Sequence, residues 1–197
     1  MTKHQPVDQR RNQILEAALM MFTQKGVAST SMSDIVNASG LSKGGVYWHF
    51  KSKSDIIVGA LERFMQRDLG ALEAIAFKSQ MGPIQKLKAV SAQLGSEIEA
   101  LRSALPLLIE VYAMAGRNDA IKASLQRYYA AFQDLLANIL EDGVEEGLFA
   151  VEDTQFAAWQ LITHAEGHFL LWMLNPQAAL KDQLVESVDL FVYGLKK

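Results

Sequence analysis

The chain has 197 residues, is 50% hydrophobic, carries a net charge of −3 and contains no cysteine, which excludes disulfides, thiolate metal sites and cysteine nucleophiles. Its apolar content is enough for a sizeable core, yet no uncharged apolar run is long enough to suggest a membrane span. The polar start, residues 1–13, lacks the apolar segment of a signal peptide, so we expect a cytoplasmic protein without membrane contact.

The charge is distributed unevenly along the chain. Residues 1–54 hold seven Lys and Arg against three Asp and Glu, a net +4, which leaves −7 for the remainder. A basic end on an acidic protein attracts a polyanion at that end. Chance scatter of surface charge gives such an excess too, so the asymmetry supports a nucleic-acid partner without deciding it.

Short capped helices dominate the first third of the chain. Ser31 with Asp34, and Ser52 with Asp55, have the spacing of capping boxes, and Ser42 suits a further helix cap. Several capped helices joined by tight turns are typical of a helix-turn-helix. The predicted helices of this part span Asp8–Gln24, Met32–Ser39, Lys43–His49 and Lys53–Ala76.

Longer amphipathic segments fill the remaining two thirds, separated by glycine and proline signals. Few prolines and long stretches without glycine favour an all-helical chain. The predicted helices of this part span Pro83–Ala100, Leu105–Met114, Asp119–Glu146, Asp153–Leu174 and Lys181–Leu195.

Two glycines inside one short predicted helix carry the most information. Gly44 and Gly45 should each cost about 1 kcal/mol relative to alanine. Bare backbone at this point makes sense if a large partner approaches closely. Val46 and Phe50, four residues apart, can pack inward and leave the neighbouring Lys, Tyr and Trp side chains for sugar, phosphate and base edges. The alternative is a tight turn whose aromatic side chains only pad a small core.

Residues 11 to about 61 resemble the DNA-binding head of the TetR family of bacterial regulators. The resemblance rests on Ile14-Leu-Glu-Ala-Ala-Leu…Phe22, on the stretch from Gly26 to Ile35, and above all on Gly40-Leu-Ser-Lys-Gly-Gly-Val-Tyr-Trp-His-Phe-Lys-Ser-Lys53. It implies an all-α fold of about nine helices. Residues 1–54 would form a three-helix DNA-binding head, and residues 55–197 a larger helical body for ligand binding and dimerisation.

The resemblance also implies roles for single residues. Lys43 would face guanine O6 and N7, with a phosphate contact as the alternative. The hydroxyl groups before the first short helix would meet phosphate at its N-terminus. The candidate DNA-binding residues are Thr30, Ser31, Ser33, Ser42, Lys43, Gly44, Gly45, Tyr47, Trp48, His49 and Lys53.

For the body, the resemblance implies a dimer built from the last two long helices and a ligand cavity among the others. Bulky residues with polar handles suit such a cavity, although core packing explains them as well. The candidate ligand-binding residues are Phe64, Met65, Tyr112, Tyr128, Phe132, Trp159, His164, His168 and Trp172. The candidate dimer residues are Phe156, Leu161, Gly167, Leu170, Leu184, Val188 and Phe191, with intrachain packing as the alternative for each.

The expected function is a one-component transcriptional regulator, a repressor that binds palindromic double-stranded operator DNA as a homodimer. A small apolar or aromatic effector would release it. The alternative is a DNA-binding regulator controlled by a protein partner or without a small ligand. We expect no enzyme, because the sequence has no glycine-rich phosphate loop, nucleophile motif or paired acid constellation. We also expect no cofactor and no metal, since His164 and His168 have no evident third ligand.

Overall fold

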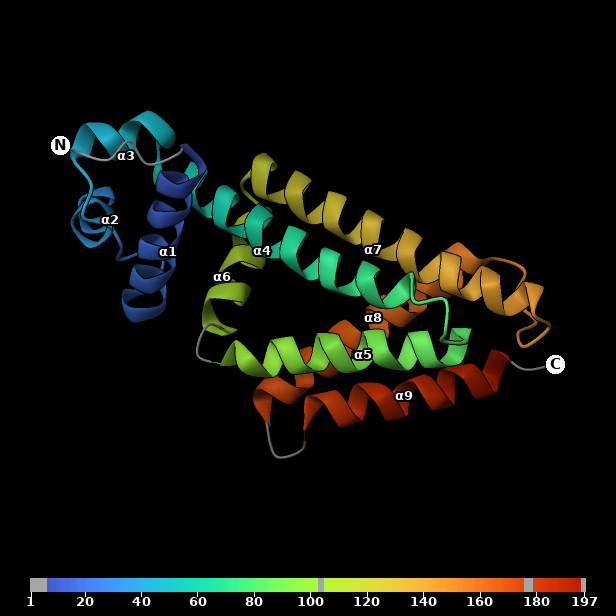
Figure 1. Cartoon of the computed structure of the whole chain (residues 1–197). Helices are drawn as coiled ribbons and strands as arrows, with labels where there is room; N and C mark the ends of the chain where they lie inside the picture. The colour runs from blue at the N-terminus through green and yellow to red at the C-terminus, as the bar shows by residue number, and fades with distance from the viewer. Residues whose placement is uncertain (1–6, 103–104, 176–178, 196–197) are drawn as a thin grey trace. The chain divides into compact units, whose positions relative to one another are not determined.

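The computed structural model describes residues 7–102, 105–175 and 179–195, and over these residues the chain forms nine α-helices and no strand (Figure 1). This confirms the expected all-α fold, and each predicted helix lies within one residue, at either end, of an observed one. The helices are α1 (Val7–Lys25), α2 (Met32–Ser39), α3 (Lys43–His49), α4 (Lys53–Ala76), α5 (Pro83–Ala100), α6 (Leu105–Ala115), α7 (Asp119–Glu145), α8 (Thr154–Leu174) and α9 (Leu180–Leu195).

The chain divides into two compact units. The first comprises Met1–Met65 and Ser103–Leu125, and the second comprises Gln66–Arg102 and Gln126–Lys197. The continuous helices α4 and α7 each contribute residues to both units. The predicted head, residues 1–54, falls within the first unit, and its boundary as a functional domain stays a prediction.

The first unit is built on buried apolar side chains of its short helices. Ile14 and Leu15 of α1, Ile35 of α2 and Val46 of α3 are completely buried. A polar contact connects α6 to this part of the unit. The Glu110 carboxylate of α6 accepts a hydrogen bond from the Val27 N–H, in the loop before α2, at 3.1 Å. The shared buried side chains hold α1, α2 and α3 together, and Glu110 connects α6 to the loop between α1 and α2.

The second unit is a helical bundle in which α5 lies along α9 (Figure 1). Gly95 allows this close approach, because a Cβ atom at that position would come within 2.5 Å of the Lys181 Cα. Burial of apolar side chains drives the packing. The buried core of the second unit consists of Leu72, Leu87, Val90, Phe132, Leu135, Leu136, Ala137, Ile139, Leu140, Phe149, Ala157, Ala158, Ile162, Val188 and Val192.

Candidate nucleic-acid interface and body cavity

The caps predicted for α2 and α3 are present. Ser31 Oγ accepts a hydrogen bond from the Asp34 N–H at 3.1 Å, and the Asp34 carboxylate accepts one from the Ser31 N–H at 2.8 Å. Ser42 Oγ accepts from the Gly45 N–H at 3.1 Å. The Lys25 ammonium, followed by the Ser31 hydroxyl and N–H, holds the pKa of Asp34 well below its usual range. Asp34 is thus an ionised cap at the positive end of α2.

Helix α3 has one buried side and one open side. Val46 is completely buried and Phe50, which caps the helix, is 3% exposed, as the spacing predicted. Trp48 is 64% exposed, and Lys43 and Gly44 are also exposed. The core contacts therefore fix the helix while its opposite side faces outward.

Of the two helix glycines, Gly44 has no internal packing reason, whereas a side chain at Gly45 would crowd the Ser42 cap. Neither has a positive φ. A Cβ at Gly44 would meet nothing within 4 Å, and one at Gly45 would meet only the Ser42 Oγ at 3.3 Å and the Leu41 Cβ at 3.9 Å among the described atoms. The absence of side chains here leaves the backbone open to a partner from outside.

Two candidate DNA-binding residues are placed differently from the prediction. Thr30 is 1% exposed, and its hydroxyl donates to the Gly26 carbonyl at 2.8 Å. The Lys53 ammonium donates to the Val27, Ala28 and Thr30 carbonyl oxygens at 2.8, 3.3 and 2.8 Å. Both side chains thus stabilise the loop before α2, which corrects their assignment as direct phosphate contacts. Ser31 and Ser33 are exposed beside them.

The aromatic end of α3 lies beside basic residues that the candidate set lacks. The His49 ring packs edge-on against Trp48, with centroids 4.6 Å apart. Partial burial, and then the charges of Arg10 and Arg11, lower the pKa of His49. Near neutral pH, His49 is therefore a neutral hydrogen-bonding group. Both arginines are visible in the sequence on the predicted helix Asp8–Gln24, but sequence spacing does not place them near α3.

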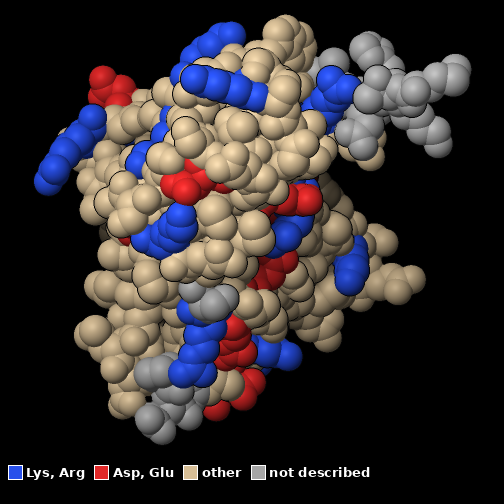
Figure 2. All heavy atoms as spheres, turned by 90° about the vertical axis from the view of Figure 1, so that its left-hand side faces the viewer, with Lys and Arg blue, Asp and Glu red and all other residues tan. Residues whose placement is uncertain are grey.

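Positive charge accompanies this arrangement. The Lys43 ammonium lies 5.8 Å from the centroid of the half-exposed Tyr47 ring, one turn further along α3. Figure 2 shows more Lys and Arg than Asp and Glu over the upper part of the face it draws. Cations beside open backbone and exposed aromatic rings can bind a phosphate backbone and reach base edges.

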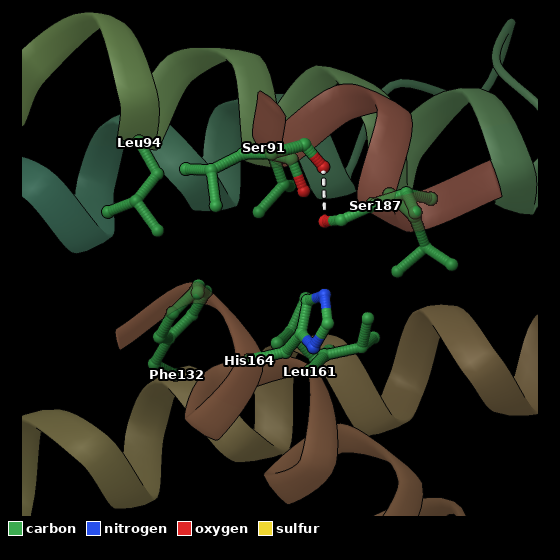
Figure 3. A pocket seen from close by; sticks show the side chains of 12 residues that line it. Ser91, Leu94, Phe132, Leu161, His164 and Ser187 are labelled. Carbon is green, nitrogen blue, oxygen red and sulfur yellow. Dashed lines mark hydrogen bonds between the residues drawn. The ribbon is translucent and has the colours of Figure 1, made fainter. Parts of the chain in front are cut away.

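The second unit contains a small cavity between α5, α7, α8 and α9 (Figure 3). Its volume of about 20 Å³ is enough for roughly one water molecule. Of the candidate ligand-binding residues, Phe132 and His164 line it. The other lining residues are Leu87, Val90, Ser91, Leu94, Leu136, Leu161, Ala165, Leu184, Ser187 and Val188.

The other candidate ligand-binding residues lie elsewhere. Phe64, Met65 and Tyr112 belong to the first unit. Trp172 is buried with the Arg102 guanidinium 5.8 Å from its ring centroid, and Trp159 is 40% exposed. Two further candidates lie next to lining residues, because the Tyr128 ring contacts Phe132 and the Nε2 of His168 lies 3.1 Å from that of His164.

The candidate dimer residues divide into two groups. Leu184 and Val188 are each 2% exposed, so they belong to the core of the chain, which corrects their assignment to an exposed dimer face. Leu161 and Phe191 are partly buried against that core. Phe156, Gly167 and Leu170 are exposed on α8. The same two helices carry further large exposed apolar side chains that the candidate set lacks, namely Leu171 and Leu174 on α8 and Leu190 and Tyr193 on α9.

No helix in the described ranges is long and apolar enough to cross a membrane. Within the same ranges, no group of three or more His, Cys, Asp or Glu side chains could hold a metal ion.

Two family profiles match the chain. Residues 14–60 match "Bacterial regulatory proteins, tetR family", and residues 83–195 match "BetI-type transcriptional repressor, C-terminal". The curated relatives include YfiR of Bacillus subtilis, an uncharacterized HTH-type transcriptional regulator. It is 30% identical over 146 residues, which cover 72% of this chain and 69% of YfiR.

Similar solved structures include SmeT, the repressor of the Stenotrophomonas maltophilia multidrug efflux pump SmeDEF. It is 26% identical with a TM-score of 0.76 and covers 95% of this chain and 90% of its own. A SmeT–triclosan complex is similar at 25% identity with a TM-score of 0.77, covering 96% of this chain and 92% of its own.

Proposed function

Because the chain belongs to the TetR family of bacterial regulatory proteins, we propose that it is a repressor that binds a palindromic operator as a homodimer and is released by a small-molecule effector. The observation that carries the DNA-binding part is the open side of α3. There, the exposed Lys43 begins the helix, and the exposed Gly44, without an internal packing partner among the described residues, lies opposite the buried Val46. Lys43 reads base edges, while Tyr47 and His49 contact the phosphate backbone.

Dimerisation follows from the size of the reading element. One short α3 helix spans only a few base pairs, so specific binding uses two copies on a palindrome. The apolar surface of α8 and α9 supports this, because Leu170 is 52% exposed and Leu174, Leu190 and Tyr193 are each 78% exposed. Large apolar side chains left exposed on two packed helices are typical of a protein–protein interface.

The cavity in the second unit supports effector control. A cavity that holds about one water cannot hold an organic molecule until the helices around it separate. An effector therefore binds the expanded conformation better than the closed one and shifts the population toward it. Since α7 lines the cavity and also contributes its first turns to the first unit, movement of this continuous helix reaches both units. The SmeT–triclosan complex supports an apolar, aromatic effector body.

The small volume of the cavity is also the observation that favours the alternative, a regulator controlled by a protein partner or without a small ligand. The two functions differ in two measurable properties. An effector-controlled repressor gains thermal stability with a small ligand at saturating concentration, and that ligand lowers its operator affinity.

Selection of bound duplexes from a random library tests the proposal. We expect a palindrome whose half-sites are about one helical turn, roughly 10 base pairs, apart or a multiple of it. Operator affinity should fall steeply with salt. A library that yields no enriched sequence, or only a single unrepeated half-site, contradicts a dimeric operator-binding protein.

A further inference from the structure

A buried carboxylate in the second unit lacks part of its hydrogen bonding. Asp68 of α4 is 1% exposed. The Tyr128 hydroxyl donates to its Oδ2, but within the described residues no N–H or O–H group of another side chain or of the backbone donates to Oδ1. A buried carboxylate oxygen without a donor is costly, so such a group calls for a function.

A second acid faces Asp68. Glu97 of α5 receives a hydrogen bond on Oε1 from the Gln93 amide at 3.0 Å, whereas its buried Oε2 accepts none. The Arg67 guanidinium pairs with this Oε2 at 3.7 Å, and within the described part of the chain it is the one cation paired with either carboxylate. With both acids ionised, the pair keeps one negative charge that Arg67 does not neutralise.

The titration of Asp68 agrees with this excess. Burial raises its pKa to about 6, while the Tyr128 hydroxyl acts against this rise. The charge of Glu97, and the hydrogen bond that a protonated Asp68 makes with Glu97, also raise the pKa, and the Arg67 charge lowers it. Asp68 is therefore ionised at neutral pH at an energetic cost that a further cation would remove.

The acid pair lies one helical turn from the cavity. On α5, Leu94 lines the cavity and precedes Glu97 by three residues. On α7, Phe132 lines the cavity, and its ring centroid lies 6.2 Å from that of Tyr128. Figure 3 shows Leu94 and Phe132 at the same end of the cavity. An apolar group in an expanded cavity can thus be continuous with a polar group at the acid pair.

We propose that Asp68 and Glu97 form the cation-binding end of the effector site, and that the effector is a small protonated amine with an apolar body. This inference rests on the proposed effector control. An ammonium group supplies both the missing charge and N–H donors for Asp68 Oδ1 and Glu97 Oε2. A quaternary ammonium supplies the charge without the donors, and an alcohol supplies a donor without the charge. The aliphatic or aromatic body extends toward Leu94 and Phe132.

Calorimetric titration of the full-length protein with matched ligands tests the inference. The probes are primary amines from hexylamine to tryptamine, each paired with its alcohol analogue and its trimethylammonium analogue. At pH 7.5 we expect at least one amine to bind about 10- to 100-fold more tightly than both analogues, as charged hydrogen bonds in a buried site would give. Its affinity should fall by up to about tenfold per pH unit below the pKa of Asp68, near 6.

Three variants complete the design. Asp68→Asn keeps the acceptor for Tyr128 and should remove the preference for the amine. Glu97→Gln should weaken it as well, and provides the test if the first variant does not fold. Asp134→Asn, which alters an exposed acid of α7, is the matched control and should bind like the unaltered protein.

The inference is overturned if no amine of the series binds more tightly than its analogues, or if Asp68→Asn and Glu97→Gln both keep the preference. Operator release is measured separately. Amine binding that leaves operator affinity unchanged contradicts the proposed effector control but keeps the site. Release by an uncharged ligand, with no amine preference, contradicts the site and keeps effector control.

Discussion

Replacement of Asp68 by asparagine should stabilise the protein at neutral pH. The folded structure raises the pKa of this carboxyl from 3.8 to about 6. A native group with a raised pKa holds its proton more tightly than the unfolded chain, so its contribution to stability is complete below about pH 4 and is lost as the pH rises through about 6. A shift of about two units corresponds to about 3 kcal/mol in the free energy of unfolding.

Asparagine has nearly the same shape as aspartate and carries no charge. Its side-chain oxygen can still accept from the Tyr128 hydroxyl, which is the hydrogen bond that Asp68 makes. We therefore expect Asp68→Asn to raise the free energy of unfolding by about 2–3 kcal/mol at pH 7.5 and by well under about 1 kcal/mol near pH 4.

Urea denaturation at both pH values, at one fixed protein concentration, measures this difference, because the stability of a dimer depends on protomer concentration. Asp134→Asn is the control for loss of an acid at the surface and should change stability by less than about 0.5 kcal/mol. A variant that is less stable than the unaltered protein at pH 7.5, or equally stabilised at both pH values, would refute the reasoning that the ionised Asp68 is costly.

Three further substitutions test the interface, the loop and the dimer. Gly44→Ala should raise head stability by about 1 kcal/mol, because the new methyl meets nothing within 4 Å among the described residues. It should also weaken operator binding in an anisotropy titration, and unchanged binding contradicts close approach of DNA. Lys53→Ala should lower the free energy of unfolding in urea by about 2 kcal/mol, because charged hydrogen bonds are lost. It should leave the salt dependence of DNA affinity unchanged, and a flatter dependence argues for a phosphate contact instead. Leu170→Asp should give monomers in sedimentation velocity, and a persistent dimer rules out the α8 surface as the interface.

Local spacing in the sequence was sufficient to predict the positions of the helices, the caps of α2 and α3, and the inward side chains of α3. Capping at Ser31, Asp34 and Ser42 depends on residues three apart, and the inward packing of Val46 and Phe50 depends on residues four apart. Such contacts form within a single turn of helix. They can therefore be predicted without knowing what packs against the helix.

Contacts between distant segments could not be predicted in this way. The Lys53 ammonium reaches carbonyl groups 23 to 26 residues away, so its role depends on how α4 meets the loop before α2. Helix α9 is apolar on two faces, and sequence periodicity does not tell which is covered by the chain. Val188 is on the covered face, and Leu190 and Tyr193 are on the exposed one.

The acid pair gave no sequence signal at all. Asp68 and Glu97 each stand in an amphipathic helical pattern, in which a carboxylate usually marks the solvated face. Only the packing of α4 against its neighbours in the second unit brings Asp68 into the interior and leaves one of its oxygens without a donor. Such a position is visible in the folded structure alone.

The central claim is that the open side of α3 reads DNA sequence, and Lys43→Ala tests it most directly. Anisotropy titrations would compare its affinity for the selected operator with its affinity for a random duplex at one salt concentration. We predict an operator affinity lower by roughly 5- to 150-fold, the equivalent of about 1–3 kcal/mol for a base contact, with a much smaller change on random DNA. Equal losses on both duplexes would contradict base reading by Lys43.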